Sequence, residues 1–129
     1  MLVIVGATLG ACGSGSSSHT LTGNLTLTSA GDFPQLAVDN PVCTGTGGYD
    51  DLTEGAEVTV RDDKDKLIAT GNLLAGFRID DDTCTFKYVI AKVPSAKFYV
   101  VTVTHRGGVT YSAAELAQHK WTIETSIGS

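Results

Sequence analysis

Residues 43–60 read CTGTGGYDDLTEGAEVTV and join a cysteine, a glycine-rich turn, an acidic pair and a β-strand. In the second half, Val58 and Val60 alternate with polar residues, a period of two that is typical of a half-buried strand. Residues 62–66 form a polar turn, and residues 67–74 then return as a second apolar run. The stretch therefore predicts a β-hairpin that carries an acidic loop in front of its first strand.

Other segments of the chain show the same alternation of apolar and polar residues. It predicts strands at residues 20–28, 84–90, 98–105, 109–111 and 121–127. Residues 98–105, FYVVTVTH, have the highest β-propensity of the chain and predict a central strand. The last strand would place Trp121, Ile123, Thr125 and Ile127 on one face, and Tyr88, Tyr99 and Trp121 should lie in the core. Residues 29–42 contain two prolines and predict a loop with at most a short edge strand.

Two local signals lie between the last strands. Gly107 and Gly108 permit the positive φ angles of a tight hairpin turn. Ser112 and Glu115 match a capping box, which predicts one short helix near residues 113–119. The pattern as a whole predicts an all-β fold: a two-sheet antiparallel sandwich, immunoglobulin-like or transthyretin-like, with about seven strands.

The composition fits a single small domain with no charged partner. The 129 residues are enough for one buried core, and the formal net charge is −5. The nine Lys and Arg residues are spread singly along the sequence, so no basic segment is present to neutralise a row of phosphates. We therefore expect neither a nucleic-acid partner nor electrostatic attraction to anionic lipid headgroups.

The N-terminal residues predict export. Residues 1–11, MLVIVGATLGA, carry no charge and are too few to cross a bilayer, so they predict a signal peptide. Residues 9–12, LGAC, resemble a bacterial lipobox, which would make Cys12 the lipid-modified N-terminus and membrane anchor. Residues 12–20 would then be a Gly/Ser tether and residues 21–129 the folded domain. Because no basic residue precedes the apolar run, we expect the true signal peptide to begin further upstream.

An alternative would make residues 1–11 a buried strand and Cys12 a core cysteine, but the Ser-rich run that follows is hard to bury. If Cys12 carries lipid, Cys43 and Cys84 form the only possible intramolecular pair. A zinc or redox site is disfavoured by the absence of a C-x-x-C motif. We therefore predict a disulfide between Cys43 and Cys84 and an extracytoplasmic location.

The folded part resembles a small extracytoplasmic domain of secreted or lipid-anchored actinobacterial proteins that has no established activity. The resemblance covers residues 43–128 and is carried by the segments GGYDDL, VTVRD, LIATG, FYVVTVTHRG and YSAAEL, with the two cysteines and a closing Trp strand. It implies a β-sandwich fold and export. It implies no catalytic residues and no cofactor.

The carboxylates of the predicted turns are the most suggestive chemical feature. Calcium prefers several oxygen ligands from such loops, and the candidates are Asp62, Asp63, Asp65, Asp80, Asp81 and Asp82. None of them matches the calcium-loop pattern D-x-[DN]-x-[DN]-G, and two lysines lie within the first group. Solvated turns that aid solubility are the favoured interpretation, and a calcium site is the alternative.

Tyr49, Asp50 and Asp51 form a possible binding loop, because an exposed tyrosine gives a large contact area. Tyr49 folded back over the disulfide is the favoured interpretation, and the binding loop is the alternative. A hydrolase using His105 and Ser112 is disfavoured, because no G-x-S-x-G motif is present and Ser112 is expected to cap the helix.

A carrier of a small apolar ligand would need an internal cavity, and packing around Phe86, Tyr99 and Trp121 should leave little room for one. We therefore expect a non-catalytic lipoprotein of the cell envelope, acting as a binding or structural module for an envelope protein or glycan.

Overall fold

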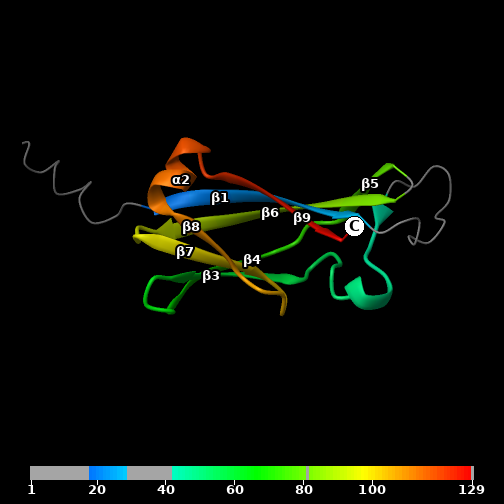
Figure 1. Cartoon of the computed structure of the whole chain (residues 1–129), viewed down its shortest axis with the longest axis horizontal. Helices are drawn as coiled ribbons and strands as arrows, with labels where there is room; N and C mark the ends of the chain where they lie inside the picture. Colours follow the sequence, from blue (N-terminus) through cyan, green and yellow to red (C-terminus); the bar gives the residue numbers. More distant parts are fainter. Residues whose placement is uncertain (1–17, 29–41, 81, 129) are drawn as a thin grey trace, which may run out of the picture.

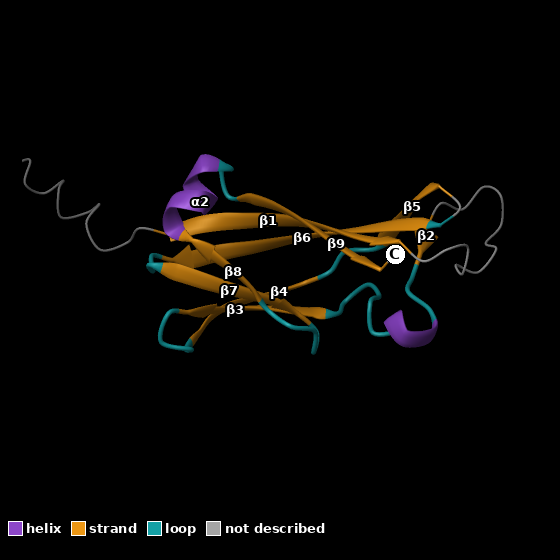
Figure 2. Cartoon of the chain, in the orientation of Figure 1, coloured by secondary structure: helices purple, strands orange, loops and turns teal. Residues whose placement is uncertain are grey.

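The computed structural model of this chain describes residues 18–28, 42–80 and 82–128, which form a two-sheet β-sandwich (Figures 1 and 2). The predicted fold class is confirmed. Several predictions concern residues outside these ranges: the signal peptide 1–11, Cys12, the tether up to residue 17, the loop 29–41, and Asp81.

The larger sheet has five strands in the order β2-β5-β6-β1-β9, and the smaller sheet has four in the order β4-β3-β7-β8. The strands of the larger sheet are β1 (Ser18–Thr28), β2 (Val42–Cys43), β5 (Gly76–Asp80), β6 (Thr83–Pro94) and β9 (Thr122–Gly128). Those of the smaller sheet are β3 (Glu57–Asp62), β4 (Leu67–Asn72), β7 (Phe98–Val103) and β8 (Val109–Ser112). A short 3₁₀ helix η1 (Gly47–Tyr49) and the helix α2 (Ala113–Gln118) complete the described elements.

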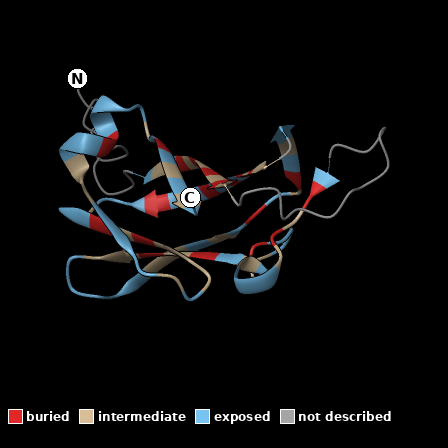
Figure 3. Cartoon of the chain, turned by 45° about the vertical axis from the view of Figure 1, so that its right-hand side comes forward, coloured by how far each residue is buried: buried red, intermediate tan, exposed pale blue. Residues whose placement is uncertain are grey.

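The core lies between the two sheets, where the buried residues of Figure 3 face one another. It follows from the alternation in the sequence, since every second residue of β1, β3 and β6 points inward. Fully buried examples are Leu21, Leu25 and Leu27 of β1, Val58 and Val60 of β3, and Phe86 and Ile90 of β6. Burial of each such side chain contributes about 1.5–3 kcal/mol. Tyr88 and Tyr99 also lie in the core, as predicted.

Among the described residues the sandwich has nine strands, two more than predicted, and the additional ones are β2 and β5. β5 was missed because its pattern is reversed. Phe77 and Ile79 are 54% and 64% exposed, whereas Gly76 is buried. The predicted strand 67–74 ends at Asn72, because Leu73 already pairs with Tyr88 of the larger sheet.

The pairing of the last strand also differs from the prediction. β9 pairs in parallel with β1, with Thr22 opposite Thr122 and Thr28 opposite Gly128, so the larger sheet is not wholly antiparallel. The reason is the connection from β8, which passes through α2 at the end of the sandwich where β1 begins (Figure 1). β9 must therefore start at that end and run in the direction of β1.

The turn between β7 and β8 uses a different residue from the one predicted. Neither Gly107 nor Gly108 has a positive φ, and the left-handed residue is Thr104, with a φ of 51°. Gly108 is nevertheless required, because a Cβ there would lie 2.5 Å from Cγ1 of Val100. Close approach to β7, and not backbone conformation, therefore explains this glycine.

The helix α2 begins at the predicted capping box. The Ser112 hydroxyl accepts a hydrogen bond from the Glu115 N–H at 3.0 Å, and the Glu115 carboxylate accepts one from the Ser112 N–H at 2.9 Å. The helix ends at Gln118, with His119 as its C-cap. No helix in the described part of the chain is long and apolar enough to cross a membrane.

Trp121 lies just before β9 and not within it as predicted. Lys120 and Trp121 have positive φ angles of 54° and 60°, which turn the chain from the helix into the strand. The Trp121 ring stacks on His19 at a centroid distance of 4.0 Å and meets Tyr99 edge to face at 5.3 Å. These contacts fasten the start of β9 to the start of β1.

We expect Ser112→Ala to lower the free energy of unfolding by about 1 kcal/mol, because the Glu115 N–H loses its acceptor. Urea unfolding followed by circular dichroism would measure the change. The control is Glu115→Gln, which can still accept the reciprocal hydrogen bond and should change the stability by much less. Equal losses in both variants would contradict this explanation.

Candidate functional site

A disulfide joins Cys43 of β2 to Cys84 of β6, as predicted, and both cysteines are buried. Their Cα atoms are 6.0 Å apart, and the bridge passes over β5, which lies between the two strands. A Cβ on Gly76 of β5 would lie 2.8 Å from the Cys84 sulfur, so the bridge requires glycine there. Such disulfides are typical of oxidising, extracytoplasmic compartments.

The predicted acidic loop leaves this bridge and is bound to the turn between β7 and β8. The Asp51 carboxylate accepts hydrogen bonds from Nε and Nη2 of Arg106 and from the Thr104 hydroxyl. Such two-pronged arginine–carboxylate pairs are stronger than single hydrogen bonds. Asp51 therefore holds the loop in place, whereas Asp50 is exposed.

Tyr49 lies under the same arginine. The Arg106 guanidinium stands over the Tyr49 ring, 5.0 Å from its centroid, and Nη2 also donates to the Gly48 carbonyl at 2.9 Å. Leu52, which is fully buried, anchors the other side of the loop. The structure thus brings Tyr49 and Asp51 together around Arg106, a residue that the sequence analysis did not include in this site.

The pKa of Asp51 reflects this arrangement. Partial burial raises it, but the hydrogen bonds from Arg106, and then from Thr104, outweigh burial and hold the pKa of Asp51 below its ordinary value. The carboxylate is therefore ionised at neutral pH, and its stabilising contacts depend on that charge.

The proposed calcium ligands lie at opposite ends of the sandwich. The β3–β4 turn holds Asp62, Asp63 and Asp65, and the β5–β6 turn holds Asp80 and Asp82 (Figure 1). Asp62 Oδ1 accepts the N–H groups of Lys64 and Lys66 at 2.8 and 2.9 Å, and Asp80 Oδ1 accepts that of Asp82 at 3.2 Å. Within the described ranges, no group of three or more His, Cys, Asp or Glu residues could hold a metal ion.

These turn contacts also lower the pKa values of both carboxyl groups. For Asp62 the main cause is the hydrogen bond from the Lys66 N–H, and for Asp80 it is the hydrogen bond with the Asp82 side chain. The observed contacts therefore stabilise the turns themselves.

His105 and Ser112 are not brought together. His105 lies in the turn after β7, whereas Ser112 pairs with Phe98 at the other end of the same hairpin and caps α2. His105 borders an open hollow with Asp51, Glu54 and Glu57, but no hydrogen bond joins it to a serine or a carboxylate within the described chain.

An exposed apolar patch, which the sequence analysis missed, lies on the outer face of the larger sheet beside the disulfide. Val42 and Phe77 are paired neighbours, and Ile79 lies two residues further along β5. The three are 39%, 54% and 64% exposed, and we call them the outer patch. The alternation of Phe77 and Ile79 with Gly76 and Arg78 could have predicted a strand whose apolar residues face outward, and thus the outer patch.

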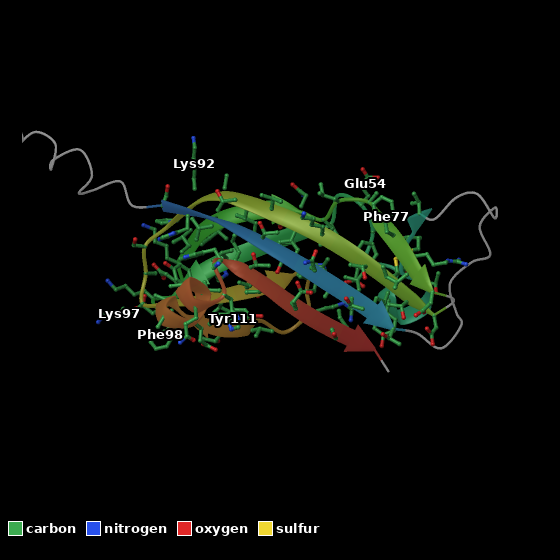
Figure 4. All side chains as sticks on the ribbon, turned by 90° about the horizontal axis from the view of Figure 1, so that it is seen from above. Glu54, Phe77, Lys92, Lys97, Phe98 and Tyr111 are labelled. Carbon is green, nitrogen blue, oxygen red and sulfur yellow. A yellow bond between two sulfur atoms is a disulfide. The ribbon has the colours of Figure 1, made fainter. Side chains whose placement is uncertain are left out.

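The opposite end of the sandwich, where β1 begins, carries lysines. We call it the tether end and define it by Lys92, Lys97, Phe98 and Lys120. Ser18 pairs with Pro94 there, and the Ala113 N–H donates to the Lys97 carbonyl at 3.0 Å. Figure 4 shows Lys92, Lys97 and Phe98 at this end and Phe77 at the other. All four residues of the tether end are exposed.

Fold and bridge together define a two-sheet β domain tied by one disulfide. Comparison with known proteins identifies no family: no family model matches the chain, and neither a curated protein nor a solved structure is similar to it. The function must therefore be argued from the residues themselves.

We expect Asp51→Asn to lower the free energy of unfolding at pH 7 by about 1 kcal/mol, because the charge-assisted pair with Arg106 is lost from a partly exposed site. Since the folded-state pKa is depressed, the stabilisation is full above the unfolded pKa of about 3.9 and disappears as the pH falls through the folded pKa. Urea unfolding of both proteins between pH 7 and pH 3 would show the difference shrinking.

The control is Asp50→Asn, which changes the neighbouring exposed carboxylate and should leave the stability nearly unchanged throughout. A difference between wild type and Asp51→Asn that persists undiminished at pH 3 would contradict the assigned role.

Proposed function

We propose that this protein is a non-catalytic, lipid-anchored domain of the cell envelope that binds another envelope protein through the outer patch. The observation that carries the proposal is that the two ends of the sandwich differ. The exposed apolar patch lies at one end, and β1, which follows the segment from Cys12, begins at the other end. The disulfide supports the extracytoplasmic location.

The length of the tether supports the orientation. Only a few residues separate Cys12 from Ser18, where β1 begins, and a fully extended chain of that length spans at most about 20 Å. A lipid on Cys12 would therefore keep the tether end close to the membrane. The outer patch lies near the start of β6, whereas the tether end lies near the end of that strand. At ~3.4 Å per residue, the two ends are roughly 35 Å apart.

The charge at the tether end supports the same orientation. Lys92 and Lys97 flank the β6–β7 turn and Lys120 follows α2, so all three lie at this end, where Glu115, the acidic residue of α2, is engaged in the capping box. Each lysine near an anionic membrane surface contributes about 1 kcal/mol of attraction. The β3–β4 turn points to the same end (Figure 1) and carries both signs of charge. The three lysines thus add positive charge to the end that would face the membrane.

The chemistry of the outer patch favours a protein over a glycan. The side chains of Val42, Phe77 and Ile79 offer no hydrogen-bonding groups, whereas the hydroxyls of a sugar need them. Leu74 and Val89, which are 51% and 46% exposed, are further exposed apolar residues of the larger sheet and of the segment before β5. Contiguous exposed apolar surface of this kind marks protein–protein contact sites.

We predict that a benzophenone amino acid placed at position 79 forms a covalent adduct of one defined mass in the cells that produce this protein. The same group at position 98, in the exposed aromatic residue of the tether end, should not form that adduct. The partner, identified from the adduct and purified, should bind the Phe77→Ser variant about tenfold more weakly than wild type, because an exposed aromatic is a typical hot spot.

Equal adducts from positions 79 and 98 would contradict the proposal, because the contact would then be non-specific. Unchanged affinity of the purified partner for Phe77→Ser would also contradict it. Phe98→Ser is the matched control for the binding measurement, since Phe98 is 47% exposed and Phe77 is 54% exposed.

A further inference from the structure

Along one side of the sandwich, each sheet ends in an edge strand of the described chain. β8 is the edge of the smaller sheet and β9 the edge of the larger one. A cavity of about 260 Å³ lies between the sheets along this seam. Its walls are mainly apolar and include Leu25, Val101, Val109 and Ile127. Tyr111, which Figure 4 shows beside β9, and Thr125 add hydroxyl groups. We call this the seam cavity.

Tyr88 lines the seam cavity although it lies on β6, which β1 separates from the edge strand β9. It stands on β6 opposite Gly23 of β1, and a Cβ on Gly23 would lie 2.0 Å from Cζ and 2.3 Å from Oη of the Tyr88 ring. The phenol end of the ring therefore lies directly over β1, pointing towards β9, the next strand of the sheet. Gly23 is the residue that makes room for this placement.

The Tyr88 hydroxyl is a polar group at the wall of the seam cavity, and the described part of the chain supplies no hydrogen bond to it. The residue as a whole is only 1% exposed. A hydroxyl at a cavity wall can hydrogen-bond to water or to a ligand that enters the cavity and displaces that water. Burial raises the pKa of Tyr88 far above its usual value, with smaller contributions from Tyr111 and Glu124, so the hydroxyl keeps its proton.

The size of the seam cavity limits what can fill it. Drug-sized ligands occupy pockets of about 300–1,000 Å³, and an engineered cavity of about 150 Å³ is enough for benzene. A volume of about 260 Å³ fits a molecule between these two, such as one ring with a short side chain. Mainly apolar walls that also carry a few polar groups, Tyr88 among them, favour an apolar molecule with an oxygen that can hydrogen-bond.

We propose that the seam cavity binds a small, mostly apolar molecule of the alkylphenol size class, whose single hydroxyl or carbonyl oxygen hydrogen-bonds to Tyr88. This site is separate from the outer patch and does not depend on the envelope partner.

The test uses the full chain with Cys12→Ser, so that no attached lipid competes, and two probes, 4-propylphenol and propylbenzene. Each is titrated while amide signals are followed by NMR. We expect shifts at Gly107 and Thr125 but not at Phe77. 4-Propylphenol should bind about 3- to 10-fold more tightly than propylbenzene, the effect of one neutral hydrogen bond. In Tyr88→Phe the two probes should bind equally.

The melting temperature of Tyr88→Phe should be unchanged or higher, because the lost hydroxyl has no protein partner. Tyr99→Phe is the matched control. The hydroxyl of Tyr99, which is equally buried as a residue, accepts from the Ala96 N–H at 2.7 Å and donates to the Pro94 carbonyl at 3.0 Å. Its loss should lower the melting temperature by about 3–6 °C and leave probe discrimination intact.

Three results would overturn the proposal. The first is the absence of shifts around the seam cavity with either probe at millimolar concentration. The second is a preference for 4-propylphenol that survives Tyr88→Phe, because the hydroxyl would then not be the recognising group. The third is a melting temperature of Tyr88→Phe that falls as far as that of Tyr99→Phe, which would show that Tyr88 is bonded within the protein.

Discussion

The covalent bond between Cys43 and Cys84 fixes the edge of the larger sheet, and the arrangement of that end of the sandwich follows from it. β2 has only two residues and pairs only with β5, so its backbone hydrogen bonds alone could hardly keep it in place. The bridge sets the point from which the acidic loop departs. From there Asp51 reaches Arg106 and ties the larger sheet to the β7–β8 turn of the smaller one. The outer patch beside the bridge depends on the same constraint.

The parts of the fold that could be predicted are those encoded by local pattern. The alternation around Leu25 and Phe86 fixed which faces of β1 and β6 are buried, and the capping box at Ser112 placed the helix. The parallel pairing of β9 could not be predicted, because it depends on the end of the sandwich at which α2 ends and β9 begins. The positive φ at Thr104 likewise depends on the contacts of the turn and not on its residue types.

The candidate sites were harder to predict because each joins residues that are distant in sequence. The disulfide followed from counting cysteines, but nothing local to Tyr88 indicates that its ring crosses Gly23 to the seam cavity. The outer patch was hidden because β5 reverses the usual rule of apolar residues facing inward. Of the lysines at the tether end, only Lys120 is distant in sequence from the other two, which flank the β6–β7 turn. The sequence pattern therefore predicts the core better than it predicts the surfaces and cavities that could bind a partner or a ligand.

The proposed function requires export, anchoring at Cys12 and oxidation of the other two cysteines, and one measurement tests all three. Protein purified from the membranes of its own cells would be alkylated without reduction, digested and analysed by mass spectrometry. We predict an N-terminal peptide that begins at lipid-modified Cys12, and the peptides of Cys43 and Cys84 joined by a disulfide. An unmodified Cys12 together with alkylated Cys43 and Cys84 would contradict the account.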